Sequence, residues 1–381
     1  MRIGIVCPYN YFRPGGVQFC IRDIAHYLEE RGHYVRVIVP KPRIVPKDID
    51  KNVLLVGGST EFNTPFATKA DLGISTSNEK IDALFAEQKF DVVHFHEPGI
   101  PVLSAQLISR STSANVGTMH ATLPEGVVTK SFEKLMIPFA KYLEPKIDII
   151  TAVSSVAKTT ALLYSPQATI RIVPNGIQLS HYAIKKRRHM GPKKTICFIG
   201  RLEKRKGVRY LIDAYADLRK THHNVRLVIA GDGRLRKSLE ARVEKYDIPD
   251  VEFRGFISEQ EKIDLLQTAD LYCSPALYGE SFGMVLLEAM AAGCVVVAGN
   301  NPGYASVLQE RGRLSLVNPF STIDFSQRLE LLLYDQDVRD IWLSWASKYV
   351  AQFDYSHVVD AYEAAYRDAI KASAKKRKQA S

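Results

Sequence analysis

The most regular feature of the chain is a recurrence of short apolar runs separated by stretches with helical spacing. In the first half, the runs occupy residues 3–7, 35–39, 53–56, 92–95, 116–119, 147–153 and 170–173. A second series occupies residues 196–199, 225–230, 251–253, 271–273 and 295–298. The runs are apolar nearly throughout, which is typical of strands covered on both faces. Their alternation with helical segments predicts parallel sheets joined by right-handed crossovers.

A polar and basic stretch with turn-forming residues, 176–194, interrupts the series. The chain has 381 residues, more than the roughly 250–300 at which a single core stops growing. We therefore predict an α/β protein with two Rossmann-like, doubly wound domains, residues 1–175 and 176–354. A C-terminal helix, 355–381, is expected to return to the first domain, and its basic end from residue 371 to be frayed and solvated. Ligands of such sheets bind outside the carboxyl ends of the strands, which predicts a cleft between the two domains.

Composition narrows the class of protein without choosing a partner. The chain is 46% hydrophobic and 24% charged, which excludes disorder for most of it. A net charge of +10 suits an anionic partner such as a nucleotide diphosphate, a nucleic acid or an acidic membrane surface. A charge that serves solubility alone is the alternative.

Cysteine usage and the absence of long apolar runs bear on location. The five cysteines form no C-x-x-C pair, and Cys7, Cys197 and Cys273 fall in apolar runs, as buried thiols in a reducing compartment do. No run reaches 18 apolar residues, and the first residues lead directly into a strand. We expect a cytoplasmic protein, or one bound peripherally to the cytoplasmic face of a membrane.

Two common phosphate-binding motifs are missing. The P-loop pattern G-x-x-x-x-G-K-[ST] does not occur. Gly231-Asp232-Gly233 follows a predicted strand but lacks the third glycine of the dinucleotide-binding pattern. A dehydrogenase that uses a dinucleotide is therefore disfavoured.

Two cations stand at the end of the first strand of the second half. Arg201 and Lys206 flank a loop that runs from Gly200 to Gly207 before a helical stretch. Cations in this position can neutralise the charge that grows on a diphosphate leaving group. A solvated basic loop is the alternative.

A glycine-bounded turn enters a second helix near residue 283. Glu280 lies just before the helix and Glu288 two turns inside it. The amides of Phe282, Gly283 and Met284 are free to hold phosphate at the helix start. The two carboxylates can bind hydroxyl groups of a sugar and a ribose, and a buried carboxylate without such a partner would cost several kcal/mol.

The first half offers weaker signals at the ends of its strands. Gly16 opens a helix after the first strand, where an anion or a bare turn fits equally well. His94 and His96 share one strand face, as metal ligands can, but the sequence shows no third ligand nearby, which favours a polar strand end. His120 closes another strand, either as a structural histidine or as a hydrogen-bonding group beside a sugar.

Taken together, four motifs resemble one known family. Gly15-Gly16, Pro174-Asn175-Gly176, Gly200-Arg201-x4-Lys206-Gly207 and Glu280-x7-Glu288 resemble the retaining glycosyltransferases of family four, which have the GT-B fold. The likeness extends over nearly the whole chain. Within that family, Pro14–Gln18 and His94–Pro98 are similar to segments of the bacterial phosphatidyl-myo-inositol mannosyltransferases.

The resemblance implies a role for each matching position. The donor diphosphate would be held by Gly16, Arg201 and Lys206, and the ribose by Glu288. The transferred sugar would be held by Glu280 and the amides that follow it, on Ser281, Phe282, Gly283 and Met284. His120 would lie beside the reacting carbon and Tyr9 would line the acceptor side. The catalytic set is then His120, Glu280, Arg201 and Lys206, with residues 1–175 on the acceptor side and 176–354 on the donor side.

The resemblance also implies an activity. We expect a retaining transfer of a hexose, mannose from GDP-mannose, to a lipid or glycan acceptor such as phosphatidylinositol, with neither a metal nor another cofactor. Front-face departure and attack fits this pattern, since no nucleophilic carboxylate is evident. Residues 121–126 differ from the pattern, and so does the helix expected at 78–88, which is not strongly basic; both leave the acceptor open.

Three alternatives stay open. The first is a transferase that uses UDP-glucose or a related donor on another glycolipid or on a polysaccharide precursor. The second is a sugar-nucleotide epimerase or a hydrolase of the same fold. The third is a basic protein that binds nucleic acid, although it would leave the Glu280–Glu288 pair without a purpose, and we expect no nucleic-acid partner.

Overall fold

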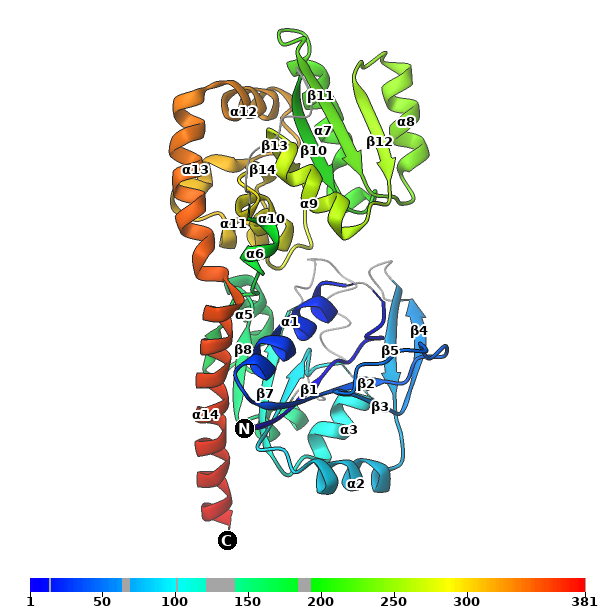
Figure 1. Ribbon diagram of the computed structural model, residues 1–381, viewed down its shortest axis with the longest axis vertical. Coiled ribbons are helices and arrows are strands. Elements are labelled where there is room, and N and C mark those ends of the chain that lie inside the picture. The colour runs from blue at the N-terminus through cyan, green and yellow to red at the C-terminus, as the bar shows by residue number, and fades with distance from the viewer. Residues whose placement is uncertain (14, 64–68, 101, 121–140, 184–192, 381) are drawn as a thin grey trace. The chain divides into compact units, whose positions relative to one another are not determined.

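The chain divides into two compact units. The computed structural model describes residues 1–13, 15–63, 69–100, 102–120, 141–183 and 193–380 (Figure 1). One unit comprises Met1–Gly176 with Tyr355–Ser381, and the other comprises Ile177–Asp354. The division falls within one residue of the boundary expected at residue 175. Residues 184–192 of the expected linker lie outside the described residues, and α6 (Leu179–Tyr182), just before them, belongs to the second unit.

A seven-stranded sheet forms the centre of the first unit. Its strand order is β3-β2-β1-β6-β7-β8-β9, and every neighbouring pair is parallel. The strands are β1 (Arg2–Val6), β2 (Tyr34–Pro40), β3 (Val53–Val56), β6 (Val92–His96), β7 (Ala114–Met119), β8 (Ile149–Ala152) and β9 (Ile170–Ile172). Each corresponds to an apolar run in the sequence, so the predicted parallel sheet is confirmed.

Helices cover both faces of this sheet. On one face lie α1 (Gly16–Glu30) and α14 (Tyr355–Ala380), which is red in Figure 1, and their apolar side chains share a core with β1, β2 and β7. On the other face, α2 (Asn78–Gln88) and α3 (Leu103–Arg110) contribute Ile81, Phe85 and Leu107 to a second core. α5 (Ser155–Tyr164) packs against β8 and β9. Coverage of both faces explains why the strands read as continuous apolar runs.

The sequence did not predict a small antiparallel hairpin in the first unit. It is formed by β4 (Gly58–Asn63) and β5 (Lys69–Ile74), outside the main sheet. The residues of these strands form no continuous apolar run, so the pattern that revealed the parallel strands is missing there.

The basic C-terminal end is helical rather than frayed, which corrects the expectation. α14 continues to Ala380, and Lys376 Nζ lies 2.9 Å from a carboxylate oxygen of Asp148. Arg377 donates through Nη2 to the carbonyl oxygen of Thr112. These contacts tie the last turns of the helix to the loops at the amino ends of β7 and β8.

The second unit repeats the same architecture with six strands. Its sheet has the order β12-β11-β10-β13-β14-β15, and every pair is parallel. The strands are β10 (Lys194–Ile199), β11 (Val225–Ala230), β12 (Val251–Gly255), β13 (Leu271–Ser274), β14 (Val295–Gly299) and β15 (Leu316–Val317). The helices are α7 (Val208–Leu218), α8 (Arg236–Lys245), α9 (Glu259–Thr268), α10 (Met284–Ala291), α11 (Pro302–Val307), α12 (Thr322–Tyr334) and α13 (Gln336–Val350). Two doubly wound α/β units are therefore confirmed.

All five cysteines are buried as free thiols, which confirms the prediction from the apolar runs. Burial raises the pKa of the Cys7 and Cys20 thiols to about 12. None of the described helices is both long and apolar enough to cross a membrane.

Candidate functional site

Glu280 is the centre of the candidate donor site in the second unit. It lies in the loop between β13 and α10, and its Oε1 accepts a hydrogen bond from Arg205 Nη1 at 2.7 Å and one from Lys206 Nζ at 2.8 Å. The three side chains are between 13% and 21% exposed. A single carboxylate oxygen thus holds two cations in a partly buried position, where ion pairs are screened less than at the surface.

The two cations are positioned by a tight turn. Lys204–Lys206 forms a single 3-10 turn, and Gly207 follows it with a φ of +70°. A Cβ at Gly207 would lie 2.1 Å from the carbonyl oxygen of Pro275, so only glycine fits here. α7 begins at the next residue. The loop after β10 is thereby held against the loop after β13.

Arg201, the other predicted cation, is mostly exposed. Its side chain is 63% exposed, and its guanidinium lies 3.6 Å from Glu203 rather than beside Glu280. Arg205, which was not predicted from the sequence, lies beside Lys206 and contacts the same oxygen of Glu280. Of the two predicted cations, the structure brings only Lys206 to Glu280.

The start of α10 offers backbone donors next to Glu280. Gly283 precedes the helix with a φ of +105°, and a Cβ there would lie 2.7 Å from the ring of Tyr304. The first amides of a helix have no partner within the helix, and its dipole favours an anion at this end. Met284 opens the helix, while Phe282 is buried and its ring meets that of Phe353 edge to face. Of the residues whose amides were predicted to bind the donor, Met284 opens the helix, Gly283 is its N-cap, and Ser281 and Phe282 lie in the loop before it.

Glu288 lies about one turn into α10, rather than the two turns expected, and has its own cation. Lys262 Nζ of α9 is 3.0 Å from Glu288 Oε2 and 2.7 Å from Glu259 Oε1. Burial raises the pKa of the Glu288 carboxyl, and the charge of Lys262 opposes that shift. Lys262 was not predicted from the sequence. It faces Glu288 from a neighbouring helix at a separation in sequence that no local motif reveals.

Three buried histidines occupy the carboxyl ends of β6 and β7 in the first unit. His96 Nδ1 lies 2.7 Å from His120 Nε2, and the two rings are stacked. His94 instead contacts the hydroxyl groups of Tyr366 and Thr118 at 2.8 and 2.6 Å. Burial lowers the pKa of His94 to about 3 and that of His120 to about 4, so both rings are neutral near pH 7.

The structure brings Cys20, which was not predicted from the sequence, close to His96 and His120. Atoms of Cys20, His96 and His120 lie within 4.8 Å of one another, all buried. However, two nitrogens bound to one zinc ion would be about 3.4 Å apart, given Zn–N distances of about 2.0–2.1 Å and tetrahedral angles. The 2.7 Å between His96 Nδ1 and His120 Nε2 is a hydrogen-bond distance. The geometry thus favours a hydrogen-bonded pair over a shared metal ion.

The other predicted residues of the first unit are Gly16 and Tyr9. Gly16 is the first residue of α1, which has no capping side chain and no acidic residue in its first turn, and a Cβ on Gly16 would meet nothing within 4 Å. The helix start is thus open to an anion. Tyr9 forms an isolated bridge with Leu72 of β5, and burial raises its pKa well above the ordinary value. Gly16 belongs to the first unit, whereas Glu280, Lys206 and Glu288 belong to the second.

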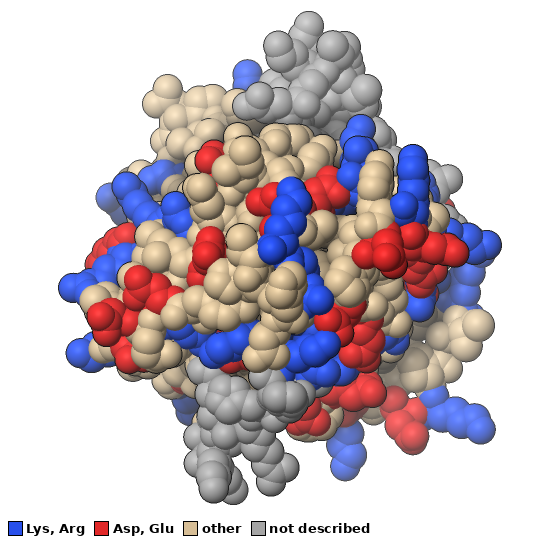
Figure 2. Space-filling model, turned by 90° about the horizontal axis from the view of Figure 1, so that it is seen from above, with Lys and Arg blue, Asp and Glu red and all other residues tan. Residues whose placement is uncertain are grey.

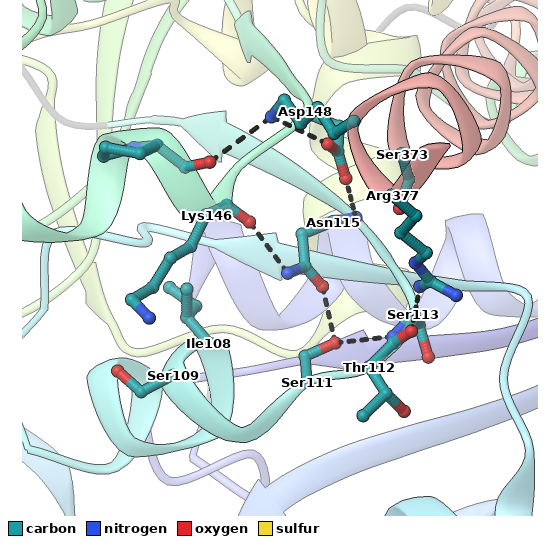
Figure 3. A pocket seen from close by; sticks show the side chains of 12 residues that line it. Ile108, Ser109, Ser111, Thr112, Ser113, Asn115, Lys146, Asp148, Ser373 and Arg377 are labelled. Carbon is teal, nitrogen blue, oxygen red and sulfur yellow. Dashed lines mark hydrogen bonds and ion pairs between the residues drawn. The ribbon is translucent and has the colours of Figure 1, made fainter. Parts of the chain in front are cut away.

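A polar pocket of about 460 Å³ lies elsewhere in the first unit (Figure 3). It is lined by Asn115, Lys146, Asp148 and Arg377, among others, from the loops at the amino ends of β7 and β8 and from α14. His120 follows the carboxyl end of β7, so the pocket opens at the opposite edge of the sheet. None of the predicted site residues lines it.

Comparison with known proteins defines the family. The model of "Glycosyltransferase Family 4" matches residues 14–181, and that of "Glycosyl transferases group 1" matches residues 183–348. The chain is 31% identical over 366 residues to the phosphatidyl-myo-inositol mannosyltransferase of Mycolicibacterium smegmatis, which covers 94% of this chain and 91% of the relative. It is 24% identical to the alpha-monoglucosyldiacylglycerol synthase of Streptococcus pneumoniae, over 82% of this chain and 74% of the relative.

A solved structure agrees on the fold. The Anabaena protein HepE in complex with UDP matches with a TM-score of 0.76 at 18% identity, over 96% of this chain and 99% of that one. The matches cover both units, and the family models meet near the boundary between them. The chain is a glycosyltransferase that belongs to the family-four enzymes of the GT-B fold.

Proposed function

We propose that the protein transfers mannose from GDP-mannose to a lipid acceptor of the phosphatidylinositol type, with retention at the anomeric carbon. The observation that carries the proposal is the arrangement of Glu280 between Arg205 and Lys206 beside the start of α10. It combines a carboxylate for sugar hydroxyls, two cations for a diphosphate and backbone amides for its oxygens.

The charges suit departure of a nucleoside diphosphate. Negative charge grows on the phosphate oxygens as the glycosidic bond breaks, and fixed cations stabilise it without reorganisation. Arg205 and Lys206 together supply two positive charges where another enzyme would use a divalent ion, which supports the expectation that no metal or other cofactor is required. Gly16 and Arg201 stay predicted contributors to diphosphate binding.

Retention is proposed to follow front-face chemistry. The leaving phosphate oxygen would accept the proton of the attacking hydroxyl group, so the protein need not provide a nucleophile. Its contribution is to orient donor and acceptor and to stabilise the departing charge. Glu288 would bind the ribose, with Lys262 keeping its carboxylate charged, and His120 would hydrogen-bond the sugar.

The relatives support the choice of sugar and acceptor. The Mycolicibacterium smegmatis relative is named for mannose transfer to phosphatidyl-myo-inositol, and it is similar over nearly the full chain. The Streptococcus pneumoniae relative is named for a glucosyl diacylglycerol product, which makes glucose transfer from UDP-glucose to a lipid the second candidate. Residues 121–126, expected to bear on the acceptor, lie outside the described residues, and α2 at Asn78–Gln88 carries Glu79, Asp82 and Glu87 against one lysine.

Both candidates place the reaction at a membrane surface, where we expect the protein to bind peripherally on the cytoplasmic side. On the face shown in Figure 2, Lys and Arg side chains are interspersed with Asp and Glu. A nucleic-acid-binding protein would gather its positive charge into one patch. On that face the basic side chains are thus mixed with acidic ones, in keeping with a small anionic substrate and with our expectation of no nucleic-acid partner.

The test is a matrix of donors and acceptors. GDP-mannose and UDP-glucose would each be incubated with vesicles that contain phosphatidylinositol or diacylglycerol, and labelled lipid product would be measured. The proposal expects product from GDP-mannose with phosphatidylinositol, and it fails if only another pair is used. Nucleotide release without any acceptor would instead support a hydrolase.

Variants test the residues. Glu280→Ala and Lys206→Ala should each reduce transfer by at least 100-fold, in line with the loss of a group that stabilises developing charge. The exposed residues Glu244 and Lys237 of α8 provide matched controls, and Glu244→Ala and Lys237→Ala should leave transfer unchanged. Near-normal transfer by either site variant would refute the proposed donor site.

A further inference from the structure

The paired rings of His96 and His120 have four nitrogens, and their environments are unequal. One nitrogen of each ring is used in the contact between them, His96 Nδ1 and His120 Nε2 at 2.7 Å. His96 Nε2 is buried without a hydrogen-bond partner among the described residues. His120 Nδ1 has no hydrogen-bond partner within the part of the chain that the structure describes, and the residue is 6% exposed.

Only one proton can lie between the two rings, so there are two possible tautomeric arrangements of the neutral pair. If His120 Nε2–H donates, His96 must carry its own proton on Nε2, which becomes a buried N–H without an acceptor. If His96 Nδ1–H donates, His96 Nε2 carries no proton, and its lone pair is a buried acceptor without a donor. Each arrangement leaves one ring N–H without a partner among the described residues. In the first it is on His96 Nε2, which is fully buried, and buried N–H groups without acceptors are rare. In the second it is on Nδ1 of His120, which keeps 6% of its surface exposed. The second arrangement is therefore preferred.

The surrounding contacts hold both rings in this relation. The backbone N–H of His120 donates to Glu97 Oε1 at 2.6 Å, which anchors the chain at the end of β7. Glu97 itself has a φ of +49°, an uncommon conformation for a residue other than glycine. The ring of His94 is tilted by 38° against that of His96, with the centroids 4.2 Å apart, and it is held by contacts with Tyr366 and Thr118. The pair is thus set in a rigid polar layer.

We propose that His96 is a positioning residue that donates from Nδ1 and thereby holds His120 in the tautomer with its proton on Nδ1. His120 then presents a hydrogen-bond donor to its ligand and is not available as a general base from that atom. As a consequence for transfer, which rests on the proposed function, His120 contacts an oxygen lone pair of the substrate and takes no proton in the reaction.

The tautomer can be observed directly in the full-length protein. With ¹⁵N-labelled histidine, long-range ¹H–¹⁵N spectra distinguish protonated from unprotonated ring nitrogens, and a His120→Gln spectrum assigns the signals. We expect His120 Nδ1 to be protonated and Nε2 unprotonated from pH 6 to 8. A proton on His120 Nε2 in the unmodified protein overturns the proposal whatever the enzyme transfers, so this readout is independent of the proposed function.

Two variants separate positioning from packing. His96→Asn places an amide donor near the position of Nδ1 and should keep the proton on His120 Nδ1. His96→Leu offers no donor and should shift His120 toward the Nε2-protonated form. An unchanged tautomer in His96→Leu contradicts the assignment, and if that variant fails to fold, the ring nitrogen that carries the proton of His120 in the unmodified protein still decides it.

Kinetics and metal analysis complete the test. His96→Leu should lower kcat/KM about tenfold, the effect of one misdirected hydrogen bond, and His96→Asn should restore it to within about threefold. The apparent pKa values in the pH profile of kcat/KM should be the same in His96→Asn as in the unmodified protein. Stoichiometric zinc in the purified protein, lost in Cys20→Ser, would overturn the proposal, because a bound metal would occupy the nitrogens assigned here to the hydrogen bond.

Discussion

Gly303 offers a sharp test of how the donor loop is held. This buried glycine lies in the first turn of α11, and a Cβ on it would come within 1.9 Å of the carbonyl oxygen of Glu280 and 3.1 Å of the amide nitrogen of Ser281. The helix cannot easily retreat. Asn301 caps it and donates to the carbonyl of Ala276 at 2.9 Å, while the hydroxyl group of Tyr304 contacts Ser274 at 2.7 Å.

Gly303→Ala should therefore move the loop that carries Glu280. Contacts of a Cβ below 3.0 Å essentially never occur, so the two backbones must separate by about 1 Å. Glu280 holds Arg205 and Lys206 at 2.7 and 2.8 Å, and a shift of that size breaks hydrogen-bond geometry. A misplacement of about 1 Å costs roughly 100-fold in rate, and overpacking of this kind costs about 1–3 kcal/mol of stability.

The measurement is kcat/KM for sugar transfer, together with nucleotide binding by calorimetry and the thermal midpoint. We expect kcat/KM to fall about 100-fold, with a cooperative thermal transition a few degrees lower. Gly99→Ala is the matched control, because a Cβ at Gly99 meets no atom within 4 Å. If Gly303→Ala folds and keeps kcat/KM within threefold of the original, contact with Gly303 does not set the position of Glu280.

Three further predictions use other features. Lys262→Met removes the cation beside Glu288, and we expect the KM for the nucleotide sugar to rise about tenfold, whereas an unchanged KM would separate Glu288 from donor binding. His94 takes up no proton in the folded state until about pH 3, but does so in the unfolded state near its ordinary pKa of 6.5, so the free energy of unfolding falls as pH drops through this range. Denaturant titrations between pH 6.5 and 4 measure how steeply the free energy of unfolding falls with pH. That slope should be smaller by about 1.4 kcal/mol per pH unit in His94→Gln than in the unmodified protein, and equal slopes would contradict a buried neutral imidazole. All five thiols should resist DTNB at pH 8 in the native protein and react in denaturant, and rapid native labelling would show that one of them is accessible.

The sequence predicts the sheets well because the parallel strands are buried on both faces. Every apolar run used for the prediction corresponds to a strand, as at Val225–Ala230 and Val295–Gly299. The β4–β5 hairpin escaped because its residues carry no continuous apolar run. The end of α14 was expected to be frayed because it is strongly basic. In the structure, Lys376 contacts Asp148 and Arg377 contacts the carbonyl oxygen of Thr112.

The candidate site could be predicted only where the spacing of residues along one loop or helix determines where their side chains point. Glu280, Gly283 and Glu288 lie in one loop and helix, so their relation follows from the sequence. In the turn before Gly207, spacing does not say which side chains point toward Glu280, and Arg205 rather than Arg201 does so. Lys262 reaches Glu288 from another helix.

The histidine pair shows the same limit across strands. A ligand for His96 was sought along its own strand, where His94 faces the same side. Its partner instead came from the end of β7, and Cys20 approached from α1. Such neighbours are brought together by the sheet order, which single-sequence periodicity does not provide.

The place of α14 in the first unit has a consequence for how the protein is made. Val358, Tyr362 and Tyr366 complete the core on one face of that unit's sheet, yet they are translated after every residue of the second unit. On the ribosome, the second unit can finish its own core while the first still exposes the apolar surface of α1 and β7. The first unit to begin synthesis is thus the last to close, and its nascent form exposes apolar surface for longer than that of the second unit, as aggregation-prone folding intermediates do.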